Sequence, residues 1–469
     1  MRYVSTRGGM TAQPFCDVLL EGLAPDGGLA VPESVPTLSA QQLESFRTLS
    51  YPELAAKILG YFISDIETAV LESMTAQAYT SAKFRSEGIV DLRPLSNGLS
   101  LLAVSEGPTL AFKDMAMQFL GQVFPYVLNK RGTTLNILGA TSGDTGSAAE
   151  YAMKGKPGVA VFMLSPHGRM SAFQRAQMYS LRDPNIHNIA VHGVFDQAQD
   201  IVKALSGDLE FKEKYRLGAV NSINWARIAS QVVYYFWGWL RATSGPGEEV
   251  SFAVPSGNFG NILSGHIARR MGLPIRRLVL ATNENNVLEE FFRTGIYRPR
   301  SPEKTYATSS PSMDISRASN FERFVYDLFD GDSSKVAALW RQLATQGFFD
   351  LSDQQPRFEN TFGFVSGVSN HEKRLATIRR VFDETGILID PHTADGVAVA
   401  NPFVEPGIPM LVLETALPAK FSEVIEEAIG KPAPVPLGLE DLESRPQKVT
   451  VLPCDVASVR AYITEHASI

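Results

Sequence analysis

Apolar residues recur at intervals of three and four in the segment from Gly107 to Gly121, around a single lysine. They are Phe112, Met115, Ala116, Phe119 and Leu120. This spacing predicts a helix with one buried face, and it places Lys113 at the start of that helix. An ammonium group there is partly desolvated, which lowers the pKa of a lysine, and a neutral amine attacks carbonyls to form Schiff bases. The alternative to a Schiff-base lysine is one whose aliphatic chain packs against the protein while its ammonium group reaches water. For any single lysine this arrangement is the commoner one.

Two further segments share the order strand, glycine-containing loop, helix. In the first, a β-prone run at 134–138 leads into a loop at 139–146 and a helical segment at 147–154. In the second, a run at 250–254 leads into a loop at 255–261 and a helical segment at 262–271. Buried strands are also predicted at 159–164 and 186–191. The alternation indicates an α/β architecture with parallel sheets.

Composition narrows the function class. A chain of 469 residues exceeds one hydrophobic core, so we expect two or more domains. The net charge of −7, without runs of Lys or Arg, disfavours a nucleic-acid partner. Cys16 and Cys454 indicate neither a disulfide framework nor a zinc site. The start lacks the apolar core of a signal peptide, and the apolar run at 232–240 is too short to span a bilayer. We therefore expect a cytoplasmic protein without a membrane partner.

Each glycine loop opens a helix and is a candidate anion cradle, because backbone N–H groups and the helix dipole point at whatever lies above it. Asp144 and Thr145 stand where a phosphate-binding P-loop needs Lys and Ser or Thr. Neither loop has the G-x-G-x-x-G spacing of a dinucleotide fold, so the sequence disfavours both a P-loop and a site for NAD or FAD. Either loop alone is weak evidence for an anion site, because tight turns from strand to helix use glycine for its backbone geometry. Two cradles and a Schiff-base lysine together suit a cofactor that carries an aldehyde and a phosphate.

These residues resemble the pyridoxal-phosphate (PLP) enzymes of the tryptophan-synthase-β type, called fold type II, and within them the threonine synthase family of bacteria and fungi. The likeness is carried, nearly from end to end, by motifs at 3–8, 26–29, 107–114, 141–146, 221–227, 256–261, 312–315 and 415–421. It implies two parallel-sheet α/β domains with the cofactor between them and an appended N-terminal domain at 1–91. The large PLP-binding domain would comprise 92–130 and 219–469, and the small mobile α/β domain 131–218.

The resemblance also implies roles for individual residues. Lys113 would hold PLP as the internal aldimine and later shuttle protons. Thr415 would place a hydroxyl against the pyridine nitrogen, and Asp144 would lie beside the ring oxygen. The loop that would cradle the cofactor phosphate consists of Gly257, Asn258, Phe259, Gly260 and Asn261. The residues that would meet the substrate carboxylate are Thr141, Ser142 and Thr145, and those that would meet the substrate phosphate are Asn221, Ser222 and Arg227.

Two positions depart from the family pattern. Many fold-type-II enzymes have asparagine at the position of Asp144, and since a carboxylate is a poorer donor, its contact needs a proton or a water. Leu417 stands where relatives have histidine. No histidine forms a metal-binding spacing, so no metal is expected. His392 is predicted to be a satisfied histidine at a helix N-terminal cap. Of Arg169 and Arg175, at least one is expected to be a solvated helix-face charge.

We therefore expect threonine synthase activity, a PLP-dependent lyase reaction in which O-phospho-L-homoserine and water give L-threonine and phosphate by γ-elimination and β-addition of water. Within the same class, the alternative is a PLP-dependent phospho-lyase or dehydratase that gives a 2-oxo acid. Outside it, the alternative is a non-enzymatic phosphate-binding module. The sequence leaves the oligomeric state open and is compatible with a monomer.

Overall fold

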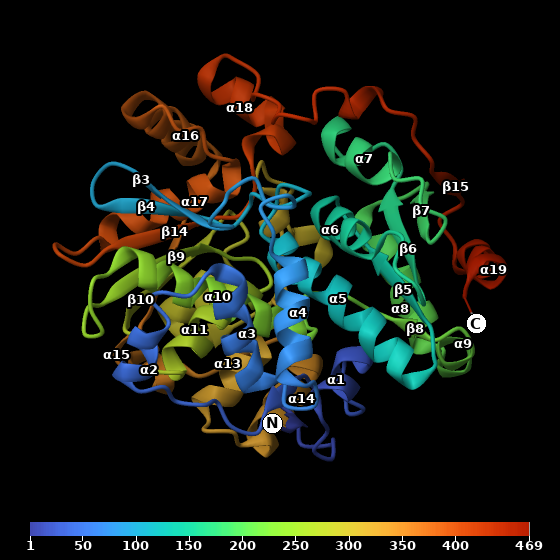
Figure 1. Cartoon of the computed structure of the whole chain (residues 1–469), viewed down its shortest axis with the longest axis horizontal. Coiled ribbons are helices and arrows are strands. Elements are labelled where there is room, and N and C mark those ends of the chain that lie inside the picture. The colour runs from blue at the N-terminus through green and yellow to red at the C-terminus, as the bar shows by residue number, and fades with distance from the viewer. Residues whose placement is uncertain (469) are drawn as a thin grey trace.

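Two sheets of parallel strands organise the protein, a computed structural model in which residues 1–468 are described (Figure 1). The larger sheet has the order β13-β10-β9-β14-β4-β3 and is parallel except for its edge pair β3–β4. Its strands are β3 (Asp91–Pro94), β4 (Leu99–Ala103), β9 (Val250–Pro255), β10 (Ile275–Thr282), β13 (Phe364–Val368) and β14 (Met410–Glu414). The central strands β9 and β14 are buried at every residue, because helices cover both faces of the sheet.

The smaller sheet has the order β15-β7-β6-β5-β8 and is parallel throughout. Its strands are β5 (Leu135–Ala140), β6 (Val159–Pro166), β7 (Ile186–Val191), β8 (Leu217–Gly218) and β15 (Thr450–Leu452). The prediction that all of 219–469 lies in the large domain is wrong for the C-terminal segment. β15 pairs with β7, and Val459 and Ile463 of α19 (Val456–His466) pack into the core of the smaller sheet. The chain thus returns to this sheet at its end.

Helices cover both sheets. Those around the smaller sheet are α5 (Lys113–Arg131), α6 (Asp144–Met153), α7 (Ala172–Tyr179), α8 (Phe195–Gly207), α9 (Leu209–Lys214) and α19. Those of the larger unit are α10 (Trp225–Ala242), α11 (Gly260–Arg270), α12 (Val287–Thr294), α13 (Phe321–Leu328), α14 (Ser333–Gln346), α15 (Gln355–Asn360), α16 (His371–Thr385), α17 (Pro391–Ala400) and α18 (Ser422–Ile429). The pair β11 (Ile296–Tyr297) and β12 (Phe349–Asp350) forms a small antiparallel ribbon. α10 is buried from Trp225 to Leu240, as predicted for its apolar run, and is therefore a core helix.

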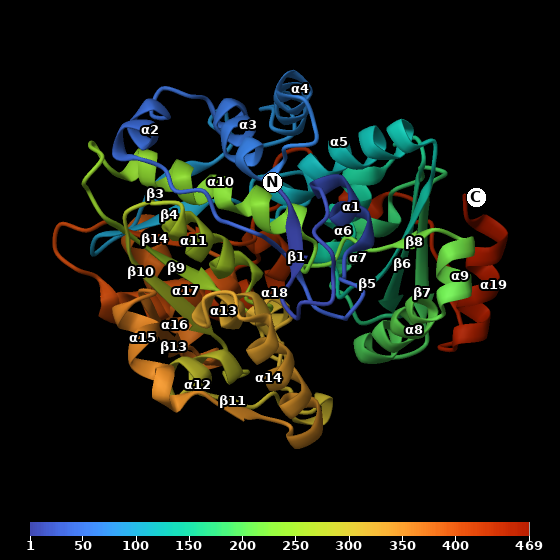
Figure 2. The ribbon, with the colours of Figure 1, turned by 90° about the horizontal axis from the view of Figure 1, so that it is seen from below.

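The N-terminal segment packs against the core helices. It contains β1 (Tyr3–Ser5), α1 (Phe15–Glu21), β2 (Ala30–Pro32), α2 (Ala40–Ser45), α3 (Tyr51–Phe62) and α4 (Thr68–Ala78). Figure 2 shows α2, α3 and α4 over one side of α10 and α5. The Tyr51 ring lies 5.4 Å from the Trp237 ring of α10, and the Tyr79 hydroxyl donates to the carbonyl of Met115 in α5 at 2.7 Å. This segment therefore buttresses the helix that carries Lys113.

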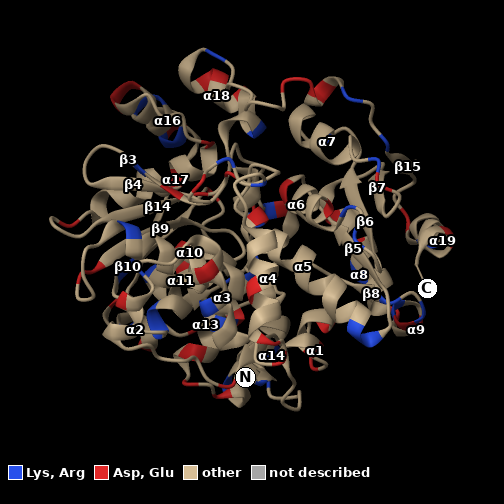
Figure 3. Ribbon diagram, viewed as in Figure 1, with Lys and Arg blue, Asp and Glu red and all other residues tan. Residues whose placement is uncertain are grey.

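α5 joins the two units, because it packs against α6 of the smaller unit and against α10 of the larger one. A Cβ atom on Gly121 of α5 would lie 2.5 Å from the carbonyl oxygen of Ala152 in α6, so only glycine allows this approach. Lys and Arg residues are interspersed with Asp and Glu residues along the ribbon (Figure 3). Within residues 1–468, no helix combines the length and the apolar character needed to cross a membrane.

Candidate active site

The predicted site residues follow the carboxyl ends of parallel strands in both sheets. Lys113 comes after β4, the loop at 256–261 after β9, Thr415 after β14, and the loop at 141–143 after β5. Carboxyl ends of parallel strands are where α/β proteins bind ligands. The residues after β5 and β14 are in contact, because Asp144 pairs with Lys420 just beyond Thr415. The site therefore lies where the two sheets meet.

Lys113 is the first residue of α5, as predicted from the apolar spacing. The loop before it is held by Asp114, which accepts hydrogen bonds from the amide and the hydroxyl of Thr109, both at 2.8 Å. A Cβ atom on Gly107 would lie 2.5 Å from the Cβ of Asp114, so this turn requires glycine. The amide of Phe112 donates to the carbonyl of Thr415 at 2.9 Å. These bonds fix Lys113 beside the end of β14.

The Lys113 amine is buried beside charged groups. Its Nζ lies 3.5 Å from Oδ2 of Asp144, and its side chain is 11% exposed. Burial lowers the pKa of Lys113, Asp144 opposes this, and the positive charges of Arg227 and Lys420 lower the pKa further. The amine is thus shifted towards its neutral, nucleophilic form, in agreement with the prediction from its buried position.

Asp144 is surrounded by donors. Its Oδ1 lies 2.8 Å from Nζ of Lys420 and 3.1 Å from Nε2 of Gln174, and its Oδ2 accepts from the hydroxyl of Ser312 at 3.1 Å. Burial alone would raise the pKa of Asp144, but Lys420 and Lys113 outweigh burial and hold it well below its usual range. Asp144 is therefore an ionised acceptor. A proton on Asp144, one of the two ways in which it was expected to contact the cofactor, is not supplied by this arrangement.

The loop at 256–261 presents unpaired donors at the start of α11. Phe259 has a φ of 65°, in the left-handed region, and α11 begins at Gly260. Oδ1 of Asn261 accepts from the hydroxyls of Tyr234 at 2.5 Å and Tyr235 at 3.1 Å, while its Nδ2 is buried without a partner. Oγ of Ser256 is likewise buried and unpaired. Unpaired buried donors at a helix N-terminus suit an anion.

Thr415 also has an unpaired buried hydroxyl, and its backbone is supported by α17. Its amide donates to Oγ1 of Thr393 at 3.3 Å. Nearby, Nδ1 of His392 lies 2.7 Å from Oδ1 of Asp390, the N-cap of α17, and Nε2 accepts from the amide of Ser312 at 3.0 Å. The prediction of a satisfied cap histidine is confirmed. His392 also holds Ser312, in the 3-10 turn η2 (Pro311–Met313), against Asp144.

The loop after β5 is organised by Thr141. Its Oγ1 accepts from the amides of Gly143 at 3.0 Å and Gly146 at 2.9 Å. Gly143 has a φ of 141°, which favours glycine. Ser142 is exposed and Thr145 is half-buried in the first turn of α6. The loop thus presents hydroxyls and a helix N-terminus, the groups that a carboxylate needs.

Arg227 is a buried cation without a counter-ion. Its side chain contacts the carbonyl of Val220 through Nη1 at 3.2 Å, and its Nε has no partner. It forms no ion pair within residues 1–468, and burial lowers its pKa to about 10. Burying an unpaired charge is costly, so this position suits an anionic ligand.

Ser319 links the two predicted phosphate-binding segments. Its hydroxyl lies 3.0 Å from the hydroxyl of Ser222 and 3.0 Å from Oδ1 of Asn258. Asn221, next to Ser222, is exposed. The 221–227 segment and the loop at 256–261 are therefore neighbours.

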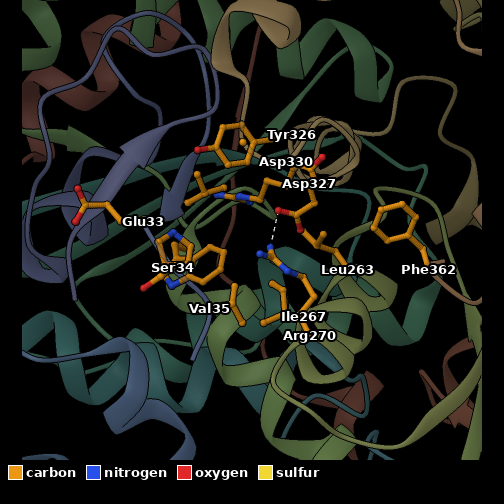
Figure 4. A pocket seen from close by; sticks show the side chains of 15 residues that line it. Glu33, Ser34, Val35, Leu263, Ile267, Arg270, Tyr326, Asp327, Asp330 and Phe362 are labelled. Carbon is orange, nitrogen blue, oxygen red and sulfur yellow. Dashed lines mark hydrogen bonds and ion pairs between the residues drawn. The ribbon is translucent and has the colours of Figure 1, made fainter. Parts of the chain in front are cut away.

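A separate cavity of ≈ 430 Å³ lies between the end of β2, α11 and α13 (Figure 4). Arg270 donates to Oδ1 of Asp327 at 2.5 Å in its wall. None of the predicted site residues lines it. This cavity is distinct from the site around Lys113.

The site residues predicted from the sequence do not include several polar residues that the structure places there. They are Gln174, Gln177, Ser312, Ser319 and Lys420. Lys420 and Ser312 lie inside the motifs at 415–421 and 312–315, and this position is the sequence feature that connects them with the site. No spacing rule connects them with Asp144, because all three lie far apart along the chain.

Known proteins resemble the whole chain. Family models described as "Threonine synthase N terminus" and "Threonine synthase, C-terminal" match residues 2–79 and 393–463. The threonine synthase of Methylobacillus glycogenes is 56% identical over 99% of this chain and 100% of its own length. The chain belongs to the threonine synthase family. The threonine synthase of Corynebacterium glutamicum is 54% identical over 99% of this chain and 98% of its own length.

Solved threonine synthases share the fold. The structure of PLP-bound threonine synthase from Brucella melitensis superposes with a TM-score of 0.96 at 41% identity, and covers 100% of both chains. The yeast threonine synthase has a TM-score of 0.93 at 36% identity, with 99% of this chain and 98% of its own covered. The fold-type-II architecture with its N-terminal segment is thereby confirmed, and the protein is a PLP-dependent lyase of this family.

Proposed function

We propose that this threonine synthase binds PLP at Lys113 and converts O-phospho-L-homoserine and water into L-threonine and phosphate. The observation that carries the proposal is a set of buried polar atoms without protein partners in the segments assigned to the cofactor and the substrate. They are Nε of Arg227, Nδ2 of Asn261, Oγ of Ser256 and Oγ1 of Thr415. Buried polar groups are nearly always paired, so a cluster of unpaired ones indicates that a polar ligand completes them.

The residues fit PLP. Lys113 supplies a buried amine for the cofactor aldehyde, and Thr415 supplies a hydroxyl beside it for the pyridine nitrogen. The cofactor phosphate is assigned to the cradle formed by Gly257, Asn258, Phe259, Gly260 and Asn261, at the start of α11. PLP supplies an electron-withdrawing ring that stores the charge left when a proton is removed from the substrate.

The substrate's two anionic groups are assigned to different segments. Its phosphate goes to Arg227, Ser222 and Asn221, because the planar guanidinium suits a phosphate and has no counter-ion of its own. Its carboxylate goes to Thr141, Ser142 and Thr145 at the start of α6. Asp144 stays ionised and accepts hydrogen bonds near the cofactor ring.

Lys113 moves the protons in this proposal. Its amine, when free of the cofactor, takes a proton from Cα of the substrate and then moves one at Cβ. Its lowered pKa supports the first step, since only the neutral amine accepts a proton. Phosphate, bound by Arg227, leaves from Cγ, and Cγ then takes up a proton to become the methyl group. Water adds its oxygen at Cβ, and a proton returns to Cα.

The proposal includes a location in the cytoplasm. The site is compatible with a monomer, because all assigned residues come from one chain. Cys16 and Cys454 are free thiols, as suits a reducing compartment.

A binding comparison tests the substrate assignment. With the PLP-loaded enzyme, we expect O-phospho-L-homoserine to perturb the visible cofactor spectrum at concentrations far below those needed for L-homoserine, which lacks the phosphate that Arg227 binds. Equal apparent affinities for the two amino acids would contradict the assignment of the phosphate to Arg227.

A further inference from the structure

Lys420 is a fully buried lysine whose three donors are all used. It lies on the 3-10 turn η5 (Pro418–Phe421) after β14 and has 0% exposed side-chain surface. Its Nζ lies 2.8 Å from Oδ1 of Asp144, 2.7 Å from the carbonyl of Thr109 and 3.0 Å from Oε1 of Gln177. An ammonium group has three N–H donors, so each one has an acceptor. A charge buried this deeply is retained only with such compensation.

The charge of Asp144 is shared by two lysines. Lys420 approaches Oδ1 at 2.8 Å, whereas Lys113 approaches Oδ2 at 3.5 Å. Within residues 1–468, Asp144 is the one carboxylate that pairs with Lys420. The closer counter-ion of Asp144 is therefore Lys420, not the amine that performs the chemistry.

On the basis of the proposed function, we propose that Lys420 is a positioning residue that acts through Asp144. Lys420 is the counter-ion of this carboxylate and compensates its negative charge. Without that compensation, Asp144 would stabilise Lys113 as an ammonium ion. Lys113 is thereby left free to be the neutral amine that bonds the cofactor aldehyde and accepts protons.

The charges around the two groups support this division. Lys113 faces Asp144 from α6, Arg227 from α10 and Lys420 from η5. Asp144 faces Lys420, Lys113 and His392 of α17. Without Lys420, the ionised Asp144 would raise the pKa of Lys113, and Arg227 would be the remaining positive charge that lowers it. An opposite charge at this range raises the pKa of a lysine by about 1 to 3 pH units.

A purely structural role is the competing explanation. Gln177 of α7 donates through Nε2 to the carbonyl of Thr109 at 3.1 Å, so Lys420 also joins α7 to the loop before Lys113. Loss of that link would disturb the loop whatever the charge on Asp144. Only the electrostatic role is repaired when the charge of Asp144 is removed as well.

Amine labelling of the full-length protein separates the two roles. After removal of PLP with hydroxylamine, the protein is treated with acetic anhydride over a range of pH, and acetylation of Lys113 is measured by peptide mass spectrometry. Since only the neutral amine reacts, the midpoint of the profile reports the apparent pKa of Lys113. The variants are Lys420→Met, Asp144→Asn, both together, and Lys431→Met as a control at an exposed lysine of the same segment.

We expect Lys420→Met to raise the midpoint by about 1 to 3 pH units, Asp144→Asn to lower it, and the double variant to return it close to the wild-type value. Lys431→Met leaves it unchanged. A Lys420→Met midpoint equal to that of the wild type, or a double variant as high as Lys420→Met, would overturn the proposal. If Lys420→Met does not fold by circular dichroism, an unchanged midpoint in Asp144→Asn overturns it instead.

The labelling result does not depend on turnover. Shifted midpoints together with a wild-type enzyme that makes no threonine would contradict the proposed function alone. Unshifted midpoints in an enzyme that makes threonine would contradict the role of Lys420 alone.

Discussion

Replacing Arg227 with methionine is expected to stabilise the ligand-free protein and to lower kcat/KM of the enzyme. Methionine has a similar length and an apolar character, so it keeps most of the packing while removing a buried charge. Burial lowers the pKa of Arg227 from its ordinary value to about 10, without a compensating carboxylate. At 1.36 kcal/mol for each pH unit, the buried charge costs the fold about 3 kcal/mol at neutral pH. Its removal therefore raises the free energy of unfolding by up to that amount.

The same substitution removes the charged donor assigned to the substrate phosphate. Hydrogen bonds to charged groups contribute about 1.5 to 3 kcal/mol each, and a guanidinium makes two of them with a phosphate. The expected loss of about 3 kcal/mol or more lowers kcat/KM at least about 100-fold, mainly through KM. The affinity for PLP changes far less, because the cofactor phosphate is assigned to the loop at 256–261.

Thermal unfolding without phosphate, steady-state kinetics with O-phospho-L-homoserine and a PLP titration measure these effects. Arg241→Met, at the exposed end of the same helix, is the matched control, and we expect it to leave KM unchanged. A less stable Arg227→Met protein with an unchanged KM would contradict both the cost of the buried charge and its role in binding the substrate phosphate. Loss of PLP with little change in KM would show that the two phosphate sites are assigned the wrong way round.

Three further substitutions are informative, two at the site and one at Glu414, the last residue of β14, whose buried carboxyl group lies 3.3 Å from Nη1 of Arg93. Lys113→Ala is expected to abolish both the visible absorption band and activity, and a colourless but active protein would contradict the role of Lys113. Thr415→Val removes an unpaired hydroxyl while keeping its shape, so the Kd for PLP rises about 2- to 10-fold by equilibrium titration, and the cofactor-free protein is not destabilised. Burial raises the pKa of Glu414 from 4.5 to about 7, so its contribution to stability is complete below pH 4.5 and is lost as the pH rises through 7. The free energy of unfolding of the wild type, compared with that of Glu414→Gln, is therefore expected to fall by on the order of 3 kcal/mol between pH 4.5 and 7. If the two proteins show the same dependence of this free energy on pH, the expectation is wrong.

The regular elements of the core could be predicted because their sequence signals are local. The run at 186–191 is apolar and β-prone throughout, and β7 has these bounds. The spacing around Lys113 predicts both the helix and its first residue. The helix after β5 begins at Asp144 rather than near residue 147, because the turn from Gly143 already has helical geometry at the next residue. The first residue of a helix is hard to predict after a glycine-rich loop, because glycine has no side chain to contribute to the apolar spacing that marks a helix.

Long-range pairings could not be predicted from the chain alone. β15 is three residues long and joins a sheet whose other strands lie more than two hundred positions earlier, so the C-terminal segment was assigned to the wrong domain. The Lys420–Asp144 pair joins two distant motifs, and no spacing rule marks it. The missing counter-ion of Arg227 is likewise visible only when every neighbour is known. The sequence therefore predicts the residue types at the site, whereas their charge states depend on the fold.

The stoichiometry of the products distinguishes threonine synthesis from release of a 2-oxo acid. PLP-loaded enzyme is incubated with O-phospho-L-homoserine in water enriched in the heavy oxygen isotope, and phosphate, threonine and 2-oxobutyrate are counted together. We expect one L-threonine for each phosphate released, with the heavy oxygen in the threonine hydroxyl. Phosphate accompanied by 2-oxobutyrate in place of threonine would contradict the proposed function.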